Sequence, residues 1–127
     1  MLNNNLKKIL IVDDEEEVLV RLGNILRRAN YNTILTTKGT EAIELATNKH
    51  PDLIILDIIL PDIAGGRIAE ILKEDTRTVN IPIIFISGIL TKQEEEACKS
   101  KNGNCYIISK PSTTAEILET INKALLR

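Results

Sequence analysis

Four short apolar runs constrain the fold of this chain more than any other feature of its sequence. They are Ile9 to Val12, Leu53 to Leu56, Ile83 to Ile86 and Tyr106 to Ile108. None approaches the roughly 20 apolar residues of a membrane helix, and none alternates with polar residues like a strand with one wet face. Uninterrupted apolar strands are typical of parallel sheets covered by helices on both faces. The runs therefore predict a buried parallel sheet.

Segments with helical periodicity separate these runs. Apolar stripes at helical spacing occupy residues 18–29, 42–46, 68–72 and 117–125. A weaker strand is expected at Asn32 to Thr36, and Thr91 to Lys101 has the composition of a helix with few apolar residues. Five strands alternating with five helices predict an α/β fold with a doubly wound parallel sheet. A length of 127 residues suits one domain, with residues 1–6 expected to form a loose N-terminal tail.

Composition excludes several classes of function. The 16 basic and 18 acidic residues leave a net charge of −2, which argues against a broad nucleic-acid surface. Aromatic residues are too scarce, at 2%, to form base-stacking platforms. Cys98 and Cys105 match neither a redox nor a zinc motif, so we expect free thiols. We expect a soluble, cytoplasmic protein that binds neither nucleic acid nor membranes.

Polar residues of complementary kinds follow the apolar runs. Asp13 and Asp14 follow the first run, Asp57 the second, Ser87 the third and Lys110 the last. Taken singly, each has an ordinary role in a helix start, a turn or a solvated surface. Ligands of open α/β sheets, however, bind beyond the carboxyl ends of the strands. We therefore expect three carboxylates, a hydroxyl and an ammonium group to converge on one edge.

Such a cluster predicts chemistry on phosphate. Carboxylates held close together repel one another and demand a cation, and Mg²⁺ binds through one or two carboxylates while keeping sites for a phosphate oxygen. Mg²⁺ on one side and Lys110 on the other would stabilise charge on a transferring phosphoryl group. A carboxylate can itself be the nucleophile, and Asp57, central in the sheet, is the best placed.

At this point the chain resembles the receiver domain of two-component response regulators, including the chemotaxis regulators. The resemblance covers essentially the whole chain. Its carriers are Ile9–Glu15, Pro51–Asp57, Pro61-Asp62 with Gly65, Ile83–Gly88 and Lys110-Pro111. It implies a flavodoxin-like fold whose five parallel strands have the order 2-1-3-4-5. It also implies a signalling domain that catalyses only its own phosphorylation and dephosphorylation.

The resemblance implies roles for the site residues. Asp57 would accept the phosphoryl group, and with Asp14 it would ligate Mg²⁺. Asp13 would act on the metal through water, and Ile59 would offer only its backbone carbonyl. Lys110 would pair with Asp57 and later with a phosphoryl oxygen.

The resemblance also implies a sensor and partners. Ser87 would donate its hydroxyl to the phosphoryl group and so sense it. The phosphoryl group would come from a histidine of a sensor kinase or phosphotransfer protein, or from a small phosphodonor. A surface formed by the fourth helix, fifth strand and fifth helix would then engage a downstream protein or a second copy.

The sequence departs from the family pattern at two places. Ala64 and Gly66 stand where a polar and a larger residue are usual. The position three residues before the lysine, where the family has its switch aromatic, is Ile107, and Tyr106 precedes it. Because side chains alternate along a strand, either a bulge near Ser109 restores the register or the domain lacks an aromatic switch, which we favour.

Two alternatives remain open. A degenerate receiver would serve as a protein-binding module without phosphorylation, but it should lack Asp57, Asp14 or Lys110, and all three are present. A flavodoxin-like enzyme or nucleotide binder needs a phosphate loop rich in Gly or Ser/Thr after the first strand. Here that loop is Asp13 to Glu17, which repels phosphate in the absence of a metal.

Overall fold

The computed structural model describes residues 6–88, 105–110 and 112–126. Its elements are β1 (Lys8–Val12), α1 (Glu16–Arg28), β2 (Asn32–Thr36), α2 (Gly39–Lys49), β3 (Leu53–Asp57), α3 (Gly65–Glu74), β4 (Ile83–Ser87), β5 (Cys105–Ser109) and α5 (Thr114–Leu125). The helix expected at Thr91 to Lys101 and most of the expected N-terminal tail lie outside the described residues. The described part of the chain therefore contains four of the five expected helices, and none of them is long and apolar enough to cross a membrane.

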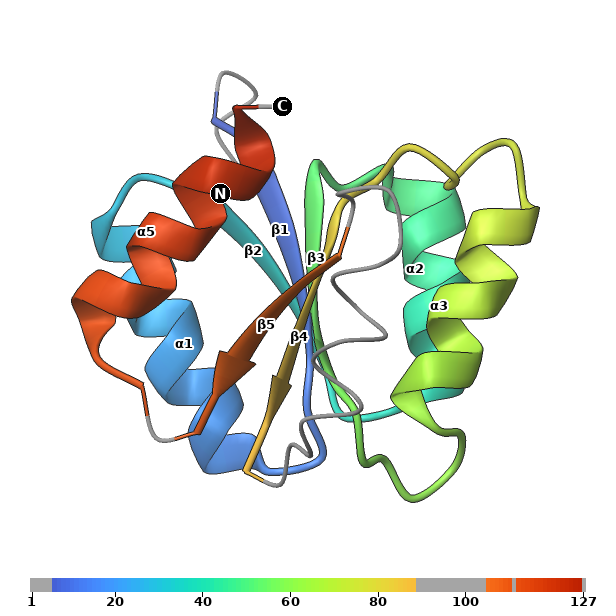
Figure 1. Ribbon diagram of the computed structural model, residues 1–127, viewed down its shortest axis with the longest axis horizontal. Helices are drawn as coiled ribbons and strands as arrows, with labels where there is room; N and C mark the ends of the chain where they lie inside the picture. Colours follow the sequence, from blue (N-terminus) through green and yellow to red (C-terminus); the bar gives the residue numbers. More distant parts are fainter. Residues whose placement is uncertain (1–5, 89–104, 111, 127) are drawn as a thin grey trace.

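The five strands form one parallel sheet in the order β2-β1-β3-β4-β5, which confirms the predicted parallel sheet and its strand order. The central strand β3 is buried at all five positions. This burial explains why its sequence shows no polar alternation, because helices cover both faces of the sheet. Figure 1 shows α1 and α5 on one side of the sheet and α2 and α3 on the other.

Alternate residues of β1, β3 and β4 supply two separate cores. Ile9, Ile11, Leu53 and Ile55 pack with apolar residues of α1 and α5. The intervening residues of the same strands pack with Ala42 and Ala46 of α2 and with Ile68 and Leu72 of α3. Full burial of each leucine or isoleucine side chain in these cores contributes about 1.5–3 kcal/mol. The two cores fix the sheet between its helices and so fix the positions of the strand ends.

Strand β5 pairs with β4 one residue to one over all five described pairs, from Ile83 with Cys105 to Ser87 with Ser109. The pairing contains no bulge in these strands, so the bulge considered above is excluded. Tyr106 packs against the core under α1 and α5. Ile107, opposite Phe85 in the register, therefore lies on the other face, because side chains alternate along a strand. The position where the resemblance places a switch aromatic therefore holds an isoleucine.

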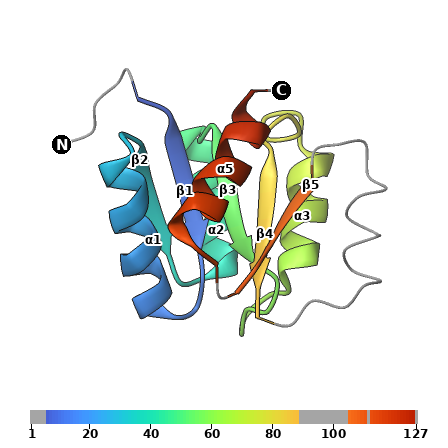
Figure 2. The same cartoon turned by 60° about the vertical axis from the view of Figure 1, so that its left-hand side comes forward.

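All five strands run in the same direction, and their carboxyl ends meet at the lower edge of the sheet in Figure 1, while the second view in Figure 2 shows the same edge from another side. The loops that follow β1 and β3 leave from this edge toward α1 and α3. Residues placed just after the strands are therefore brought together from distant parts of the sequence.

Candidate functional site

Asp13, directly after β1, is fully buried, and hydrogen bonds with backbone groups hold both its N–H and its carboxylate. Its N–H donates to the carbonyl oxygen of Thr36 in β2 at 3.2 Å. Its Oδ1 accepts a hydrogen bond from the N–H of Glu15 at 2.9 Å. One carboxylate oxygen, Oδ2, is left to face the strand ends.

Asp57 is the last residue of β3 and is only 5% exposed. Its Oδ1 accepts a hydrogen bond from the N–H of Ile59 at 3.1 Å. Burial raises the pKa of Asp57, and the negative charge of Asp13 raises it further, while the Ile59 N–H and the Lys110 ammonium act in the opposite direction. The result is a partly desolvated carboxylate whose charge is tolerated only because cationic and N–H groups face it.

Lys110 follows β5 and reaches both carboxylates. Its N–H donates to the carbonyl oxygen of Ser87 at 2.8 Å, which anchors its backbone to the end of β4. Its Nζ lies 2.8 Å from Asp13 Oδ2 and 3.3 Å from Asp57 Oδ2. Burial alone would lower the pKa of Lys110, but the hydrogen bond and charge of Asp13, followed by those of Asp57, outweigh burial and raise it. Lys110 therefore bridges two carboxylates, and Asp13 is the nearer partner.

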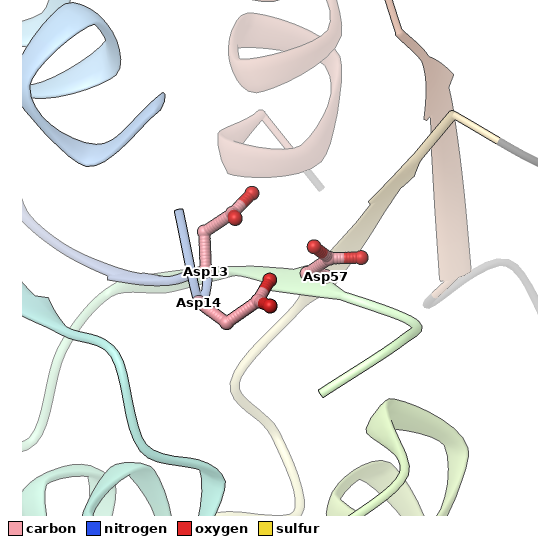
Figure 3. Close-up of side chains that lie close together, drawn as sticks. All are labelled: Asp13, Asp14 and Asp57. Carbon is pink, nitrogen blue, oxygen red and sulfur yellow. The ribbon is translucent and has the colours of Figure 1, made fainter. Parts of the chain in front are cut away.

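Asp13, Asp14 and Asp57 form an oxygen-rich cluster at this edge. One carboxylate oxygen from each lies within 4.8 Å of the others, and Figure 3 shows Asp13 and Asp14 side by side at the end of β1 with Asp57 beside them. Octahedral Mg²⁺ binds oxygen at about 2.1 Å, which places its ligands roughly 3 to 4 Å apart. The three side chains need only small shifts to meet that geometry, so the donor set fits a small hard cation.

Ser87 and Ile59 lie at the margins of this cluster. Ser87 is the last residue of β4 and is buried. In the register it comes one residue after Ile86, the partner of Asp57. Ile59 is 57% exposed, and its N–H is the group that binds Asp57. All the residues expected at the site thus come from the carboxyl ends of β1, β3, β4 and β5.

Two further residues shape the pocket, and neither was assigned a role from the sequence. Glu15 Oε1 lies 3.8 Å from Lys110 Nζ and adds a third carboxylate around the ammonium group. A Cβ on Gly65 would lie 2.4 Å from the carbonyl oxygen of Asp57, so only glycine lets α3 begin this close to β3. The acidic run after β1 indicated that some acidic residue could approach the lysine, but the sequence does not indicate that it is Glu15.

Comparison with known proteins assigns the chain to a family. The family model described as the response regulator receiver domain matches residues 9–122. The chain belongs to the response regulator receiver family. A curated relative, the polar-differentiation response regulator DivK of Brucella ovis, is 35% identical over 119 residues, which cover 94% of this receiver and 96% of DivK.

Solved receiver structures share the fold. The CheY-like response regulator receiver domain protein of Methanospirillum hungatei is 26% identical, with a TM-score of 0.85, and the match covers 95% of this receiver and 94% of that chain. The N-terminal domain of a response regulator receiver protein from Methanoculleus marisnigri is 30% identical, with a TM-score of 0.76 and coverage of 97% and 99%. Receiver domains are signalling domains, and this one carries a carboxylate cluster able to hold a metal ion.

Two small residues, Ala64 and Gly66, stand on either side of Gly65 at the start of helix α3. Ala64 is the N-cap residue and makes no side-chain capping hydrogen bond. A Cβ on Gly66 would meet nothing within 4 Å, whereas Gly65 has no room for one. The two departures from the family pattern therefore weaken the helix start without altering the packing at Gly65.

Proposed function

We propose that Asp57 accepts a phosphoryl group from a phosphohistidine of a sensor kinase or phosphotransfer protein, in the cytoplasm and with Mg²⁺ bound. Phosphorylation would then switch a protein-binding surface on β5, α5 and the segment between β4 and β5. The observation that carries this proposal is the bridging position of Lys110 Nζ, 2.8 Å from Asp13 and 3.3 Å from Asp57, beside the three-carboxylate cluster. Asp14, Asp13, Asp57 and the carbonyl of Ile59 are the proposed metal-binding groups.

The reaction follows from these positions. A carboxylate oxygen of Asp57 attacks phosphorus, the bond from phosphorus to the donor's imidazole nitrogen breaks, and its electron pair stays on that nitrogen. Partial desolvation of Asp57 favours attack, because water no longer stabilises the carboxylate. When bound, Mg²⁺ supplies charge neutralisation to the phosphoryl oxygens.

Lys110 and Ser87 bind the phosphoryl oxygens as negative charge moves from the Asp57 carboxylate onto the phosphoryl group. Lys110 already binds Asp57 and has only to follow the negative charge onto a phosphoryl oxygen. Ser87, buried at the end of β4, donates its hydroxyl to another oxygen. Because Ser87 ends β4, movement of its hydroxyl toward the phosphoryl group would alter the partner-binding surface.

Incubation with a small phosphodonor and Mg²⁺, read by intact-mass spectrometry, tests the proposal. Wild type gains one phosphoryl group, and Asp57→Asn gains none. Asp52→Asn is the matched control, because Asp52 precedes the same strand and binds the N–H of Lys8 at the opposite edge of the sheet. This control gains the phosphoryl group like wild type. No gain in wild type would contradict the proposal and favour a receiver that only binds proteins.

A further inference from the structure

Asp62, in the loop between β3 and α3, caps the N-terminus of α2, the helix that follows β2. Its Oδ1 accepts a hydrogen bond from the N–H of Gly39 at 3.1 Å. Its Oδ2 accepts from the N–H of Thr40 at 3.0 Å and from the hydroxyl of Thr40 at 3.1 Å. The first N–H groups of a helix have no partner within it, and Lys38, at the N-cap of α2, makes no side-chain capping bond. Asp62 fills that role from 22 residues away.

The charge of Asp62 suits this position. The hydrogen bond from the N–H of Thr40 lowers the pKa of Asp62 the most; desolvation opposes it, and the N–H of Gly39 and the hydroxyl of Thr40 lower the pKa further. The start of a helix carries partial positive charge, which favours a carboxylate there.

Apolar packing fastens the same loop to the same helix start. A Cβ on Gly39 would lie 2.4 Å from Ile63 Cγ2 and 2.7 Å from Ile68 Cδ1. Ile63, the residue after Asp62, therefore rests directly on the backbone of Gly39. We refer to these contacts of Asp62 and Ile63 with Gly39 and Thr40 as the α2 clamp.

The other end of the loop reaches the phosphoacceptor. Ile58 donates its N–H to Ile86 at 3.3 Å and accepts a hydrogen bond from the N–H of Gly65 at 2.8 Å. Ile59 binds the carboxylate of Asp57 through its N–H at 3.1 Å. The residue proposed to offer its carbonyl to Mg²⁺ thus lies three positions before the α2 clamp, on one short loop.

We propose that Asp62 is a positioning residue: by clamping the loop to α2 it holds the backbone of Ile59 ready for the metal and so sets the affinity of the pocket for Mg²⁺. The inference rests on the proposed function, because it uses the same metal site. Groups that hold metal ligands in place typically change metal affinity 10–100-fold when removed. Since Asp62 acts through the loop backbone, we expect the lower end of that range, about tenfold.

A Mg²⁺ titration followed through the backbone amide signal of Ile59 by NMR tests the clamp. Asp62→Ala should raise the dissociation constant about tenfold. Asp62→Asn keeps one acceptor oxygen and should fall between Asp62→Ala and wild type. The matched control is Asp75→Ala: Asp75 follows α3 at its far end and binds Arg77 within its own loop. It should leave the dissociation constant within about twofold of wild type, a difference of less than 0.5 kcal/mol.

Each outcome decides between the two proposals. Wild-type affinity in a folded Asp62→Ala would overturn the clamp and leave the proposed function intact. A wild-type chain that binds no Mg²⁺ would overturn both. If Asp62→Ala does not fold, Asp62→Asn and Thr40→Val are compared with Asp75→Asn, and unchanged affinity in the first two overturns the clamp. Thermal unfolding of every variant separates general loss of stability, which Asp75→Ala shares, from the specific loss of metal affinity.

Discussion

Asp57, at the end of β3, and Asp62, five residues later in the loop that follows, are both aspartates, but their electrostatic surroundings are opposite. Asp57 is 5% exposed, and burial and the charge of Asp13 raise its pKa. Asp62 is exposed, and hydrogen bonds from the start of α2, that of the Thr40 N–H first, lower its pKa. The fold disfavours the charge of the first aspartate and favours that of the second.

This difference separates the residues of the proposed reaction from a residue that holds the loop in place. The carboxylates of Asp13 and Asp57 are buried close to each other. Their mutual repulsion and their loss of hydration oppose folding. Ionisable groups in such surroundings are typical of functional sites. The carboxylate of the α2 clamp has N–H and O–H donors in reach and stabilises the fold directly. Sequence alone does not separate the two roles, because both residues are aspartates next to turns.

The largest expected effect comes from removing the cation of the pocket. Lys110→Met leaves Asp13 and Asp57 facing each other with no ammonium group between them, which should lower the free energy of unfolding by about 3 kcal/mol. Urea denaturation without Mg²⁺ measures the change. Lys123→Met is the control, because its pair with Glu119 is solvent-exposed on both sides and should change stability by under about 0.5 kcal/mol. Equal losses in both variants would contradict the comparison.

A smaller effect of opposite sign is expected at Asp57 itself. Asp57→Asn removes a buried charge that faces Asp13, so without Mg²⁺ it should raise the free energy of unfolding by about 1 kcal/mol. Asp62→Asn removes a charge that the helix start favours and should lower it. Denaturation of both variants beside wild type measures the two changes. If both variants shift in the same direction, the two aspartates do not differ as described.

Stability should also depend on pH in opposite ways at the two residues. The raised pKa of Asp57 means that its stabilising contribution is complete below the ordinary value of 3.8 and is lost as pH rises through the folded-state value. The lowered pKa of Asp62 means that its contribution is complete above 3.8 and is lost as pH falls through the folded-state value. Urea denaturation of wild type and each Asn variant over a pH series measures both. A wild-type advantage over Asp57→Asn that grows with pH would refute the first assignment.

Much of the fold could be predicted because a strand buried on both faces has an uninterrupted apolar sequence. The uninterrupted apolar run from Leu53 to Leu56 marks a strand covered on both sides, and all of it is buried. The rule that strand ends meet at one edge then predicted the grouping of Asp13, Asp57 and Lys110, which the structure confirms as a set of contacts.

Contacts between side chains and distant backbone could not be predicted. The clamp joins Asp62 to Thr40 across 22 residues, and its existence depends on how closely α2 approaches the loop. The same applies to the shorter distance from Lys110 to Asp13 than to Asp57. Such choices follow from shifts of less than 1 Å in packing, to which apolar periodicity is insensitive.

The smallest expected effect lies at the start of α3, just after the loop that carries Asp62. Gly66 is exposed in the first turn of α3, and a Cβ there meets nothing within 4 Å. Gly66→Ala should therefore raise the free energy of unfolding by about 0.5–1 kcal/mol, because alanine loses less backbone entropy in a helix. Gly65→Ala is the contrasting variant, since its Cβ would meet the carbonyl oxygen of Asp57 at 2.4 Å and must displace backbone. Urea denaturation measures both, and a destabilising Gly66→Ala would show that the start of α3, and not only Gly65, is fitted to the end of β3.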